Sequence, residues 1–445
     1  MDKRSHVTLL EQEFALLKAL VGLTSLSESE NAPMPMMKML SGGVRAAQIT
    51  AALIPALRAG DSDGEKGVRA RRHLASVLGR FRGLPTKLGQ WMAGGEHGDD
   101  FAGCTSDLPP IAWPAIHSAL TQAWGKPVES VVARIDENGH AASLGQVHRA
   151  WLHDGREVAI KVQYPGIRDE VEIALAALSL VPEMGPVRRH GMDLEHHRKM
   201  LRATLERELD YGIEAASQQR AHQLAGPEVI VPRIHPELSR ETILVQDWED
   251  GIAIEDAISW PQTDRDAAGA ALVRRFLRQI MHEGLVHGDP HPGNFRFRRT
   301  ASKITIVQYD HGCMIEISAQ QSAAIRNLVF SARTGTGDPL ALLASTGFAA
   351  DKLTPIAARL PQIVRILLQP LVVPGPCIAS DWHPAQAISA ELGADRWWFR
   401  AAGNPDHFLV TRAFGGLVRQ LQRLSATVDW AACWAEALDE RLPSA

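Results

Sequence analysis

The segment "HEGLVHGDPHPGNFRF", residues 282–297, and the run "ITIVQYDHGC", residues 304–313, together place a dense polar loop between β-prone stretches. Asp289 and Asn294 lie five positions apart in the loop, whose prolines and glycine restrict and shape its backbone. Asp310 follows the second β-prone stretch. Carboxylate and amide oxygens are ligands that Mg²⁺ prefers. We therefore interpret Asn294 and Asp310 as candidate metal ligands.

This loop has two alternative interpretations, a polar turn with no chemistry and a His-based metal site. A polar turn with no chemistry is the plainer reading of Asp289 taken alone. The Asp-to-Asn spacing, however, equals that of kinase catalytic loops, in which the Asp accepts a hydroxyl proton and the Asn binds Mg²⁺. With Asp310 added, a phosphoryl-transfer site is favoured over a turn. A His-based metal site is disfavoured, because His287 and His291 lie in a proline-containing stretch that cannot be a helix.

The composition is that of an ordinary globular chain, with 45% hydrophobic and 22% charged residues among 445. A net charge of −4 gives no support for a nucleic-acid-binding protein. The four cysteines are far apart and form no CxxC pair, so we expect no zinc site or disulfide framework, and a reducing cytoplasm fits. Neither a signal peptide nor an uninterrupted apolar run long enough to span a membrane is visible.

The order of helical and β-prone patterns divides the chain into four parts. Residues 1–34 read as a helix and a flexible linker, and residues 35–125 as a helical extension. Residues 126–250 contain short β-prone runs and one long helical stretch, whereas residues 251–445 are mostly helical. A small β-rich unit followed by a helical unit predicts an α+β, two-lobed protein-kinase-like fold with an N-terminal α-helical extension.

Lys161 lies in "EVAIKVQ", the second strand of a predicted hairpin whose turn is "HDGR". A lysine within a run of Val, Ala and Ile would be an awkward buried charge without an acidic partner. The pattern matches the V-A-I-K strand of kinases, in which the lysine pairs with nucleotide phosphates and with an acidic residue on a helix. An edge-strand lysine that faces water is the alternative.

The stretch before the hairpin, "NGHAASLGQVH" at 138–148, stands where a kinase carries its glycine-rich phosphate loop. Its centre is Ala141, Ala142 and Ser143, and Gly145 follows. Backbone amides of such a turn can still cradle a phosphate. The Cβ atoms of the two alanines reduce the freedom of the loop, which is not typical of an ordinary protein kinase.

A predicted helix over 192–223 places Glu206, Asp210 and Glu214 four residues apart, so that they share one face. Like charges on one face repel each other unless water or cations compensate them. Lys161 is a candidate cation for this face. A solvated acidic face is the alternative.

These motifs, in this order, resemble the UbiB/ADCK family of atypical kinase-like proteins, which are linked to ubiquinone biosynthesis. The stretches that carry the resemblance are "KLGQ" at 87–90, "AASLGQVHRA" at 141–150, "DGREVAIKVQYPGI" at 154–167, "ELDYGIEA" at 208–215, "HGDPHPGN" at 287–294 and "DHG" at 310–312.

The resemblance implies ATP and Mg²⁺ as cofactors. Lys161 would contact the phosphates and pair with Glu214, Asn294 and Asp310 would bind Mg²⁺, and Asp289 would be the catalytic base or water-positioning residue. The residues that would contact the nucleotide from the alanine-rich loop are Ala141, Ala142, Ser143, Gly145 and Gln146.

The resemblance also implies a cover over the site. Lys87 and Gln90 would fold across it, with Lys87 meeting Glu208 and Asp210, and this cover would exclude a protein substrate. ATPase activity that supports quinone or isoprenoid-lipid metabolism is the implied function. The implied partners are a nucleotide, a lipid or quinone-pathway intermediate, and a membrane contacted peripherally.

The sequence departs from the family pattern at His140, where an alanine is usual, at His311, where kinases have Phe, and at Asp247, where Glu is frequent. The two C-terminal membrane spans of some bacterial members are not seen. Two other functions fit the loop "HGDPHPGN". One is a small-molecule phosphotransferase like the aminoglycoside and choline kinases, and the other is a nucleotide-responsive, non-catalytic scaffold. The motifs "KLGQ" and "ELDYGIEA" favour the UbiB/ADCK-like function over the phosphotransferase, and the full set Lys161, Asp289, Asn294 and Asp310 argues against the scaffold.

Overall fold

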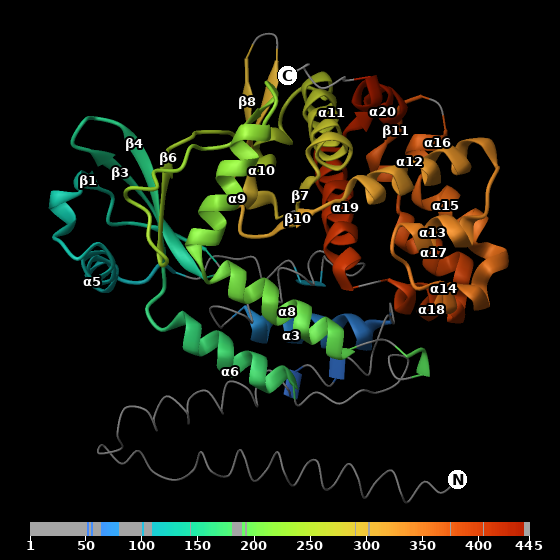
Figure 1. The fold of residues 1–445 in the computed structure, drawn as a ribbon, viewed down its shortest axis with the longest axis horizontal. Coiled ribbons are helices and arrows are strands. Elements are labelled where there is room, and N and C mark those ends of the chain that lie inside the picture. Colours follow the sequence, from blue (N-terminus) through green and yellow to red (C-terminus); the bar gives the residue numbers. More distant parts are fainter. Residues whose placement is uncertain are drawn as a thin grey trace, which may run out of the picture.

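The computed structural model confirms the predicted two-lobed α+β architecture (Figure 1). The parts of the chain that the structure describes are 51–52, 55–56, 64–79, 100–101, 109–142, 144–179, 189–191, 194–289, 291–300, 303–373, 375–403 and 405–439. In Figure 1 a small sheet lies at one end and the helices α12 to α18 at the other, with α9, α11 and α19 between them. None of the helices in these ranges is both long and apolar enough to cross a membrane.

The N-lobe is built on one antiparallel sheet in the order β1-β3-β4-β6, with β2 paired to β3. Its strands are β1 (Val132–Ile135), β2 (His140–Ala141), β3 (Gly145–Leu152), β4 (Glu157–Gln163) and β6 (Ile243–Asp247). The hairpin predicted around "HDGR" is the pair β3–β4, and Gly155 in its turn has a φ of 88° that favours glycine. In the register of this hairpin Val147 lies opposite Lys161 and Gln146 opposite Val162. Lys161 and Gln146 therefore point to opposite faces of the sheet.

The helix α5 (Trp113–Trp124) covers the sheet face opposite Lys161. Ile116, Leu120 and Trp124 are buried in one cluster with apolar residues of β4 and β6, and the Trp124 indole N–H donates to the Leu238 carbonyl at 2.8 Å. This helix therefore belongs to the core of the N-lobe, although its sequence placed it in the helical extension 35–125. The pattern of an amphipathic helix does not show which neighbour covers its apolar side.

The helix predicted over 192–223 is two helices, α8 (Leu194–Glu208) and α9 (Tyr211–Leu224), preceded by α6 (Ile167–Ser179). Asp210 is extended and its carboxylate accepts the Gly212 N–H at 2.8 Å, which caps α9. The prediction that Glu206, Asp210 and Glu214 share one helix face is therefore wrong. Glu206 is exposed beside Arg202 on α8, whereas Glu214 on α9 is buried.

The helix α3 (Glu65–Leu78) belongs to the predicted helical extension and precedes both lobes in the chain. The C-lobe contains the helices α10 to α20 and three small sheets, in the orders β5-β9-β8, β10-β7 and β11-β12. Its helices are α10 (Ile254–Ala257), α11 (Gln262–Arg278), α12 (Ala319–Thr334), α13 (Pro339–Ser345), α14 (Ala350–Leu353), α15 (Leu360–Leu367), α16 (Gln369–Val372), α17 (Pro384–Leu392), α18 (Arg396–Ala402), α19 (Pro405–Leu424) and α20 (Trp430–Asp439). Its strands are β5 (Val229–Ile230), β7 (Leu285–His287), β8 (Phe295–Arg299), β9 (Ile304–Gln308), β10 (Met314–Glu316), β11 (Cys377–Ile378) and β12 (Thr427–Val428). The strand β5 pairs parallel with β9, so the segment that the sequence assigned to the N-lobe crosses into the C-lobe.

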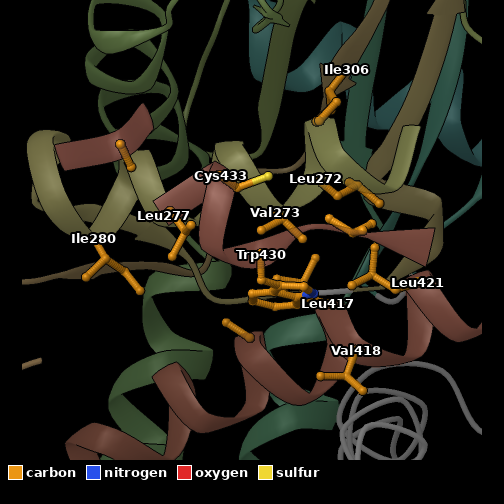
Figure 2. Packing of buried hydrophobic residues seen from close by; sticks show 14 of the residues in the cluster. Leu272, Val273, Leu277, Ile280, Ile306, Leu417, Val418, Leu421, Trp430 and Cys433 are labelled. Carbon is orange, nitrogen blue, oxygen red and sulfur yellow. The ribbon is translucent and has the colours of Figure 1, made fainter. Parts of the chain in front are cut away.

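The core of the C-lobe surrounds α11 (Figure 2). Leu272, Val273 and Leu277 of this helix are buried in one cluster with Leu421 of α19 and Trp430 of α20. The packing of α19 against α11 brings the C-terminal part of the chain next to the loop 287–294, here called the catalytic loop for its resemblance to that of kinases.

Gly269, inside α11, offers a test of this packing. Alanine is normally better than glycine within a helix by about 1 kcal/mol. Here an added Cβ would lie 2.7 Å from the Ala426 Cβ and 3.0 Å from a Val428 methyl group. We expect Gly269→Ala to lower the melting temperature, measured by circular dichroism. Ala267→Gly, at an exposed position of the same helix, is the control and should lower stability only by the difference in helix propensity between alanine and glycine. A Gly269→Ala protein with a raised melting temperature would contradict the tight packing.

Candidate active site

Lys161 and Glu214 form the ion pair that the sequence predicted. The Lys161 Nζ lies 2.8 Å and 2.9 Å from the two carboxylate oxygens of Glu214, and the side chain of Glu214 is 2% exposed. The lysine comes from β4 and the glutamate from the first turn of α9. Because a buried charge needs a partner, this pair fixes α9 against the inner face of the sheet.

Asp310 adds a second carboxylate to the same ammonium group. Its Oδ2 lies 3.1 Å from Lys161 Nζ, and its Oδ1 accepts the Gly312 N–H at 3.3 Å. The φ of Asp310 is 52°, in the left-handed region that Asp tolerates better than most residues. This turn directs the carboxylate toward Lys161 immediately after β9.

The buried carboxylate of Glu214 and the partly exposed carboxylate of Asp310 share the Lys161 ammonium group, and the pKa values of this group and of Glu214 reflect the sharing. Burial alone would lower the pKa of Lys161, but the charges of Asp310 and Glu214 raise it well above its ordinary value. Burial raises the pKa of Glu214 to about 7 against the opposing effect of Lys161, and the charges of Asp310 and Glu208 add to the rise. The ligand-free site is therefore rich in negative charge and suited to a divalent cation.

The catalytic loop is held in place by a neutral histidine. The Asp289 N–H donates to His287 Nδ1 at 3.3 Å, which leaves the proton on Nε2 for the Tyr309 carbonyl at 3.0 Å. Burial lowers the pKa of His287 and keeps this form neutral. The Asn294 amide donates to the Asp289 carbonyl at 3.2 Å, and the Tyr309 N–H donates to the Asn294 carbonyl at 2.9 Å. These bonds bring Asn294 beside the segment that carries Asp310.

Asp289 makes a buried ion pair that the sequence did not predict. An Arg412 amino group donates to the Asp289 carboxylate at 2.6 Å, and the other donates to the Gly288 carbonyl at 2.9 Å. Both side chains of the pair are at most 5% exposed. Arg412 lies on α19, more than 120 residues along the chain from Asp289, so no local pattern in the sequence indicates this contact. The buried guanidinium fixes the position of the Asp289 carboxylate, where it can orient a hydroxyl or a water.

The alanine-rich loop is a tight turn between β2 and β3. The Ala142 N–H donates to the Gly145 carbonyl at 2.8 Å, Ala141 is exposed, and Ser143 lies outside the described residues. A Cβ at Gly145 would lie 2.3 Å from the Val162 carbonyl oxygen, so glycine is required for this close approach of the strands.

The side chain of Gln146 does not face the nucleotide side of the sheet. It is fully buried on the α5 side, where its amide oxygen accepts the Ile111 N–H at 2.8 Å and its nitrogen lies 2.9 Å from His148 Nε2. This corrects the expectation that the Gln146 side chain contacts the nucleotide. Successive residues of a strand point to opposite faces, so Gln146 faces α5, whereas Gly145 is on the Lys161 face of the sheet.

The residues of the predicted cover are only partly described. Lys87 and Gln90 lie outside the described residues. Glu208 is buried at the end of α8, and its Cγ would lie 3.6 Å from a Cβ added to Gly312, next to the Lys161 cluster. Asp210 caps α9. The contact of Lys87 with these two acids stays a prediction.

His140 and His311, the two histidine departures, have different surroundings. His140 is exposed on β2. His311 is fully buried and packs edge-on against His287, with ring centroids 5.4 Å apart. Burial and the neighbouring His287 lower the pKa of His311 well below its ordinary value, so it fills an apolar aromatic position as a neutral ring. Within the described ranges no cluster of three or more His, Cys, Asp or Glu side chains could hold a metal ion. The assignment of Asn294 and Asp310 as metal ligands stays a prediction.

Residues 103–338 match the family model of the ABC1 atypical kinase-like domain. The chain belongs to this family. The ABC1 match covers the N-lobe, the alanine-rich loop, the catalytic loop and Asp310, but ends before α19 and Arg412. It is the family that the sequence motifs predicted under the name UbiB/ADCK, because the curated relatives carry ABC1, AarF and coq-8 names.

Among these relatives, the mitochondrial atypical kinase coq-8 of Caenorhabditis elegans is 29% identical over 50% of this chain and 31% of its own length. The AarF domain-containing protein kinase 1 of Mus musculus is 30% identical over 55% of this chain and 49% of its own length. The chain thus spans half or less of the length of these relatives. The solved complex of Rv3197 with erythromycin, from Mycobacterium tuberculosis, has a similar fold, with a TM-score of 0.55, 20% identity and 98% of each chain covered.

The raised pKa of Glu214 predicts a pH dependence of stability. The folded state binds this proton more tightly than the unfolded chain, so the contribution is fully present below pH 4.5 and is lost as the pH rises through about 7. The free energy of unfolding of wild type minus that of Glu214→Gln should fall by about 2–3 kcal/mol between about pH 5 and pH 7.5. Ligand-free protein in chelator is the sample, Glu206→Gln is the exposed control, and a pH-independent difference would contradict the assignment.

The Asp289–Arg412 pair predicts strong coupling between the two residues. Arg412→Gln leaves a buried carboxylate uncompensated and should destabilise the protein by about 3 kcal/mol in chemical denaturation. Asp289→Asn combined with Arg412→Gln should lose clearly less than the sum of the single changes. Arg423→Gln, at an exposed position of the same helix, is the control with little effect. Additive losses would show that the pair does not interact.

Proposed function

We propose that this ABC1-family protein binds Mg²⁺-ATP and acts as an atypical kinase or ATPase of the UbiB/ADCK type. The convergence of Lys161, Glu214 and Asp310 carries the proposal, because kinases pair the phosphate-binding lysine with a glutamate and place a metal-binding aspartate in the same site. Asn294 lies next to the Asp310 segment, because its carbonyl accepts the Tyr309 N–H. The lysine would bind phosphate oxygens, with Glu214 keeping its ammonium in place.

Asn294 and Asp310 are the residues that would hold Mg²⁺. Their amide and carboxylate oxygens suit this hard cation, and the excess of carboxylates around Lys161 leaves negative charge for it to neutralise. When bound, Mg²⁺ supplies positive charge to the phosphates. The protein's own groups orient the nucleotide through Lys161 and the acceptor through Asp289.

Hydrolysis of ATP is favoured over transfer to a protein substrate. The Arg412 guanidinium holds the Asp289 carboxylate in a fixed position, which supports a role for Asp289 in orienting a water molecule. In the alanine-rich turn the Ala142 N–H donates to the Gly145 carbonyl. This amide is therefore not directed to a phosphate in the ligand-free protein. The predicted cover by Lys87 and Gln90 would further exclude a protein substrate.

Support of quinone or isoprenoid-lipid metabolism is the biological role that we infer from the family resemblance, with peripheral membrane contact and a lipid or quinone-pathway intermediate as partner. A small-molecule phosphotransferase is the second candidate. The observation in its favour is the loop from His287 to Asn294 itself, whose prolines and His287 bonds would serve any phosphoryl acceptor. A nucleotide-responsive scaffold is the third, and the complete Lys161, Asp289, Asn294 and Asp310 set speaks against it.

Nucleotide-induced thermal stabilisation tests the proposal. Wild type with Mg²⁺ and ATP or ADP at a hundredfold excess over Kd should gain about 2.7 kcal/mol of stability. Lys161→Ala and Asp310→Asn should lose most of this gain, whereas Lys199→Ala, a surface lysine 76% exposed on α8, should keep it. Chelation of Mg²⁺ should reduce the gain in the wild type.

The hydrolysis rate, measured with and without lipid vesicles, separates the candidates. Turnover that vesicles enhance supports the ATPase. Turnover that requires a soluble hydroxyl acceptor would favour the phosphotransferase, and binding without turnover would favour the scaffold. A wild-type protein that no nucleotide stabilises would overturn the nucleotide-binding proposal as a whole.

A further inference from the structure

Tyr211, the first residue of α9, carries a buried hydroxyl group with no hydrogen-bond partner. Its side chain is only 1% exposed, and none of the described residues donates to or accepts from its Oη. A buried tyrosine hydroxyl normally finds a partner, because an unpaired polar group loses its hydrogen bonds to water and regains none. An orphaned hydroxyl in a well-packed place is therefore a candidate for a bond to a ligand.

The hydroxyl lies beside the two groups that define the phosphate side of the site. The Tyr211 ring centroid is 4.9 Å from the Lys161 Nζ, which places the ammonium over the ring. The Tyr211 Oη lies 2.8 Å from the position of a Cβ added to Gly145. Alternation along β3 directs this position to the same face of the sheet as Val147 and Lys161. The hydroxyl thus sits between the ammonium group and the end of the alanine-rich loop.

The surrounding structure fixes the ring in this place. The Tyr211 N–H donates to the Glu241 carbonyl at 2.9 Å, and Asp210 caps the helix immediately before it. The ring packs in a small apolar cluster with Ile234 and Leu244. Burial raises the pKa of Tyr211, so the phenol keeps its proton and can donate it. The ring cannot turn away to reach another acceptor without leaving this packing.

Among the described residues of the loop above the hydroxyl, Leu144 accepts the Tyr164 N–H at 3.1 Å. The strand β2, which begins the loop, contains only His140 and Ala141, and the Ala142 N–H bond to Gly145 closes the turn. A small displacement of this turn would give the hydroxyl access to the space that the loop covers. Gly145 keeps that space free of a side chain.

We propose that the Tyr211 hydroxyl donates a hydrogen bond to a phosphate oxygen of the nucleotide that Lys161 binds. This inference rests on the proposed function and adds a neutral donor from α9 to the cation from β4. A phosphate oxygen is the acceptor that fits, because the ammonium group beside the ring selects an anion. Tyr211 would then also couple the start of α9 to the presence of the nucleotide.

Tyr211→Phe tests this with two readings on the full chain, the melting temperature without ligand and the affinity for Mg²⁺-ADP. Removing an unpaired hydroxyl should leave the ligand-free melting temperature unchanged or raise it, while the affinity for ADP falls about tenfold or more. Tyr164→Phe, a second buried tyrosine that packs against α6 and α8, is the matched control and should leave the affinity unchanged.

The outcomes separate the two proposals. Unchanged ADP affinity in Tyr211→Phe, with normal binding by the wild type, would overturn the role of the hydroxyl and leave the proposed function standing. A fall in both the ligand-free melting temperature and the affinity would also overturn it, because the hydroxyl would then be needed by the folded protein itself. No binding by the wild type would overturn the proposed function first.

Discussion

The buried ammonium group of Lys161 is the constraint on which the arrangement of the site depends. It joins the sheet to α9 through Glu214 and to the segment after β9 through Asp310. A charge in this place is stable only while its partners remain, so neither α9 nor the Asp310 turn can move away from the sheet without a large cost. The relative position of three separate pieces of the chain is therefore set by one charge rather than by apolar packing alone.

The catalytic loop is held by a different kind of contact, with bonds from several elements to its own backbone. His287 bridges the Asp289 amide and the Tyr309 carbonyl as a neutral ring, and Arg412 holds the Gly288 carbonyl from below. Proline alone would stiffen the loop but would not orient it. Backbone bonds to two neighbours position the Asp289 carboxylate relative to the metal-binding candidates, which is what phosphoryl transfer requires.

The parts of the site that the sequence predicted are those with local signals. The Asp289-to-Asn294 spacing, the strand that carries Lys161 and the turn before it are all set within a few residues. The break between α8 and α9 was missed, although an Asp followed two residues later by Gly is a helix-cap signal. The face of Gln146 and the partner of Asp289 could not be predicted, because strand register and contacts between distant segments leave no period in the sequence. For the same reason the sequence did not show that α5 packs on the N-lobe sheet, because an apolar helix face does not identify the element that covers it.

The contact of Arg412 with Asp289 shows that the folded unit of this protein extends beyond the segment that matches the family. The segment shared with the ABC1 family ends at residue 338, yet a group that touches the catalytic loop comes from α19, far beyond it. The inherited domain and the cooperative folding unit are therefore not the same length of chain. A fragment that ends at the family boundary would lack α19 and α20, so the apolar side of α11 would be exposed to solvent. The Asp289 carboxylate would also lose Arg412, its ion-pair partner. Variation in the last part of the C-lobe can thus alter the candidate site from outside the segment that the family shares.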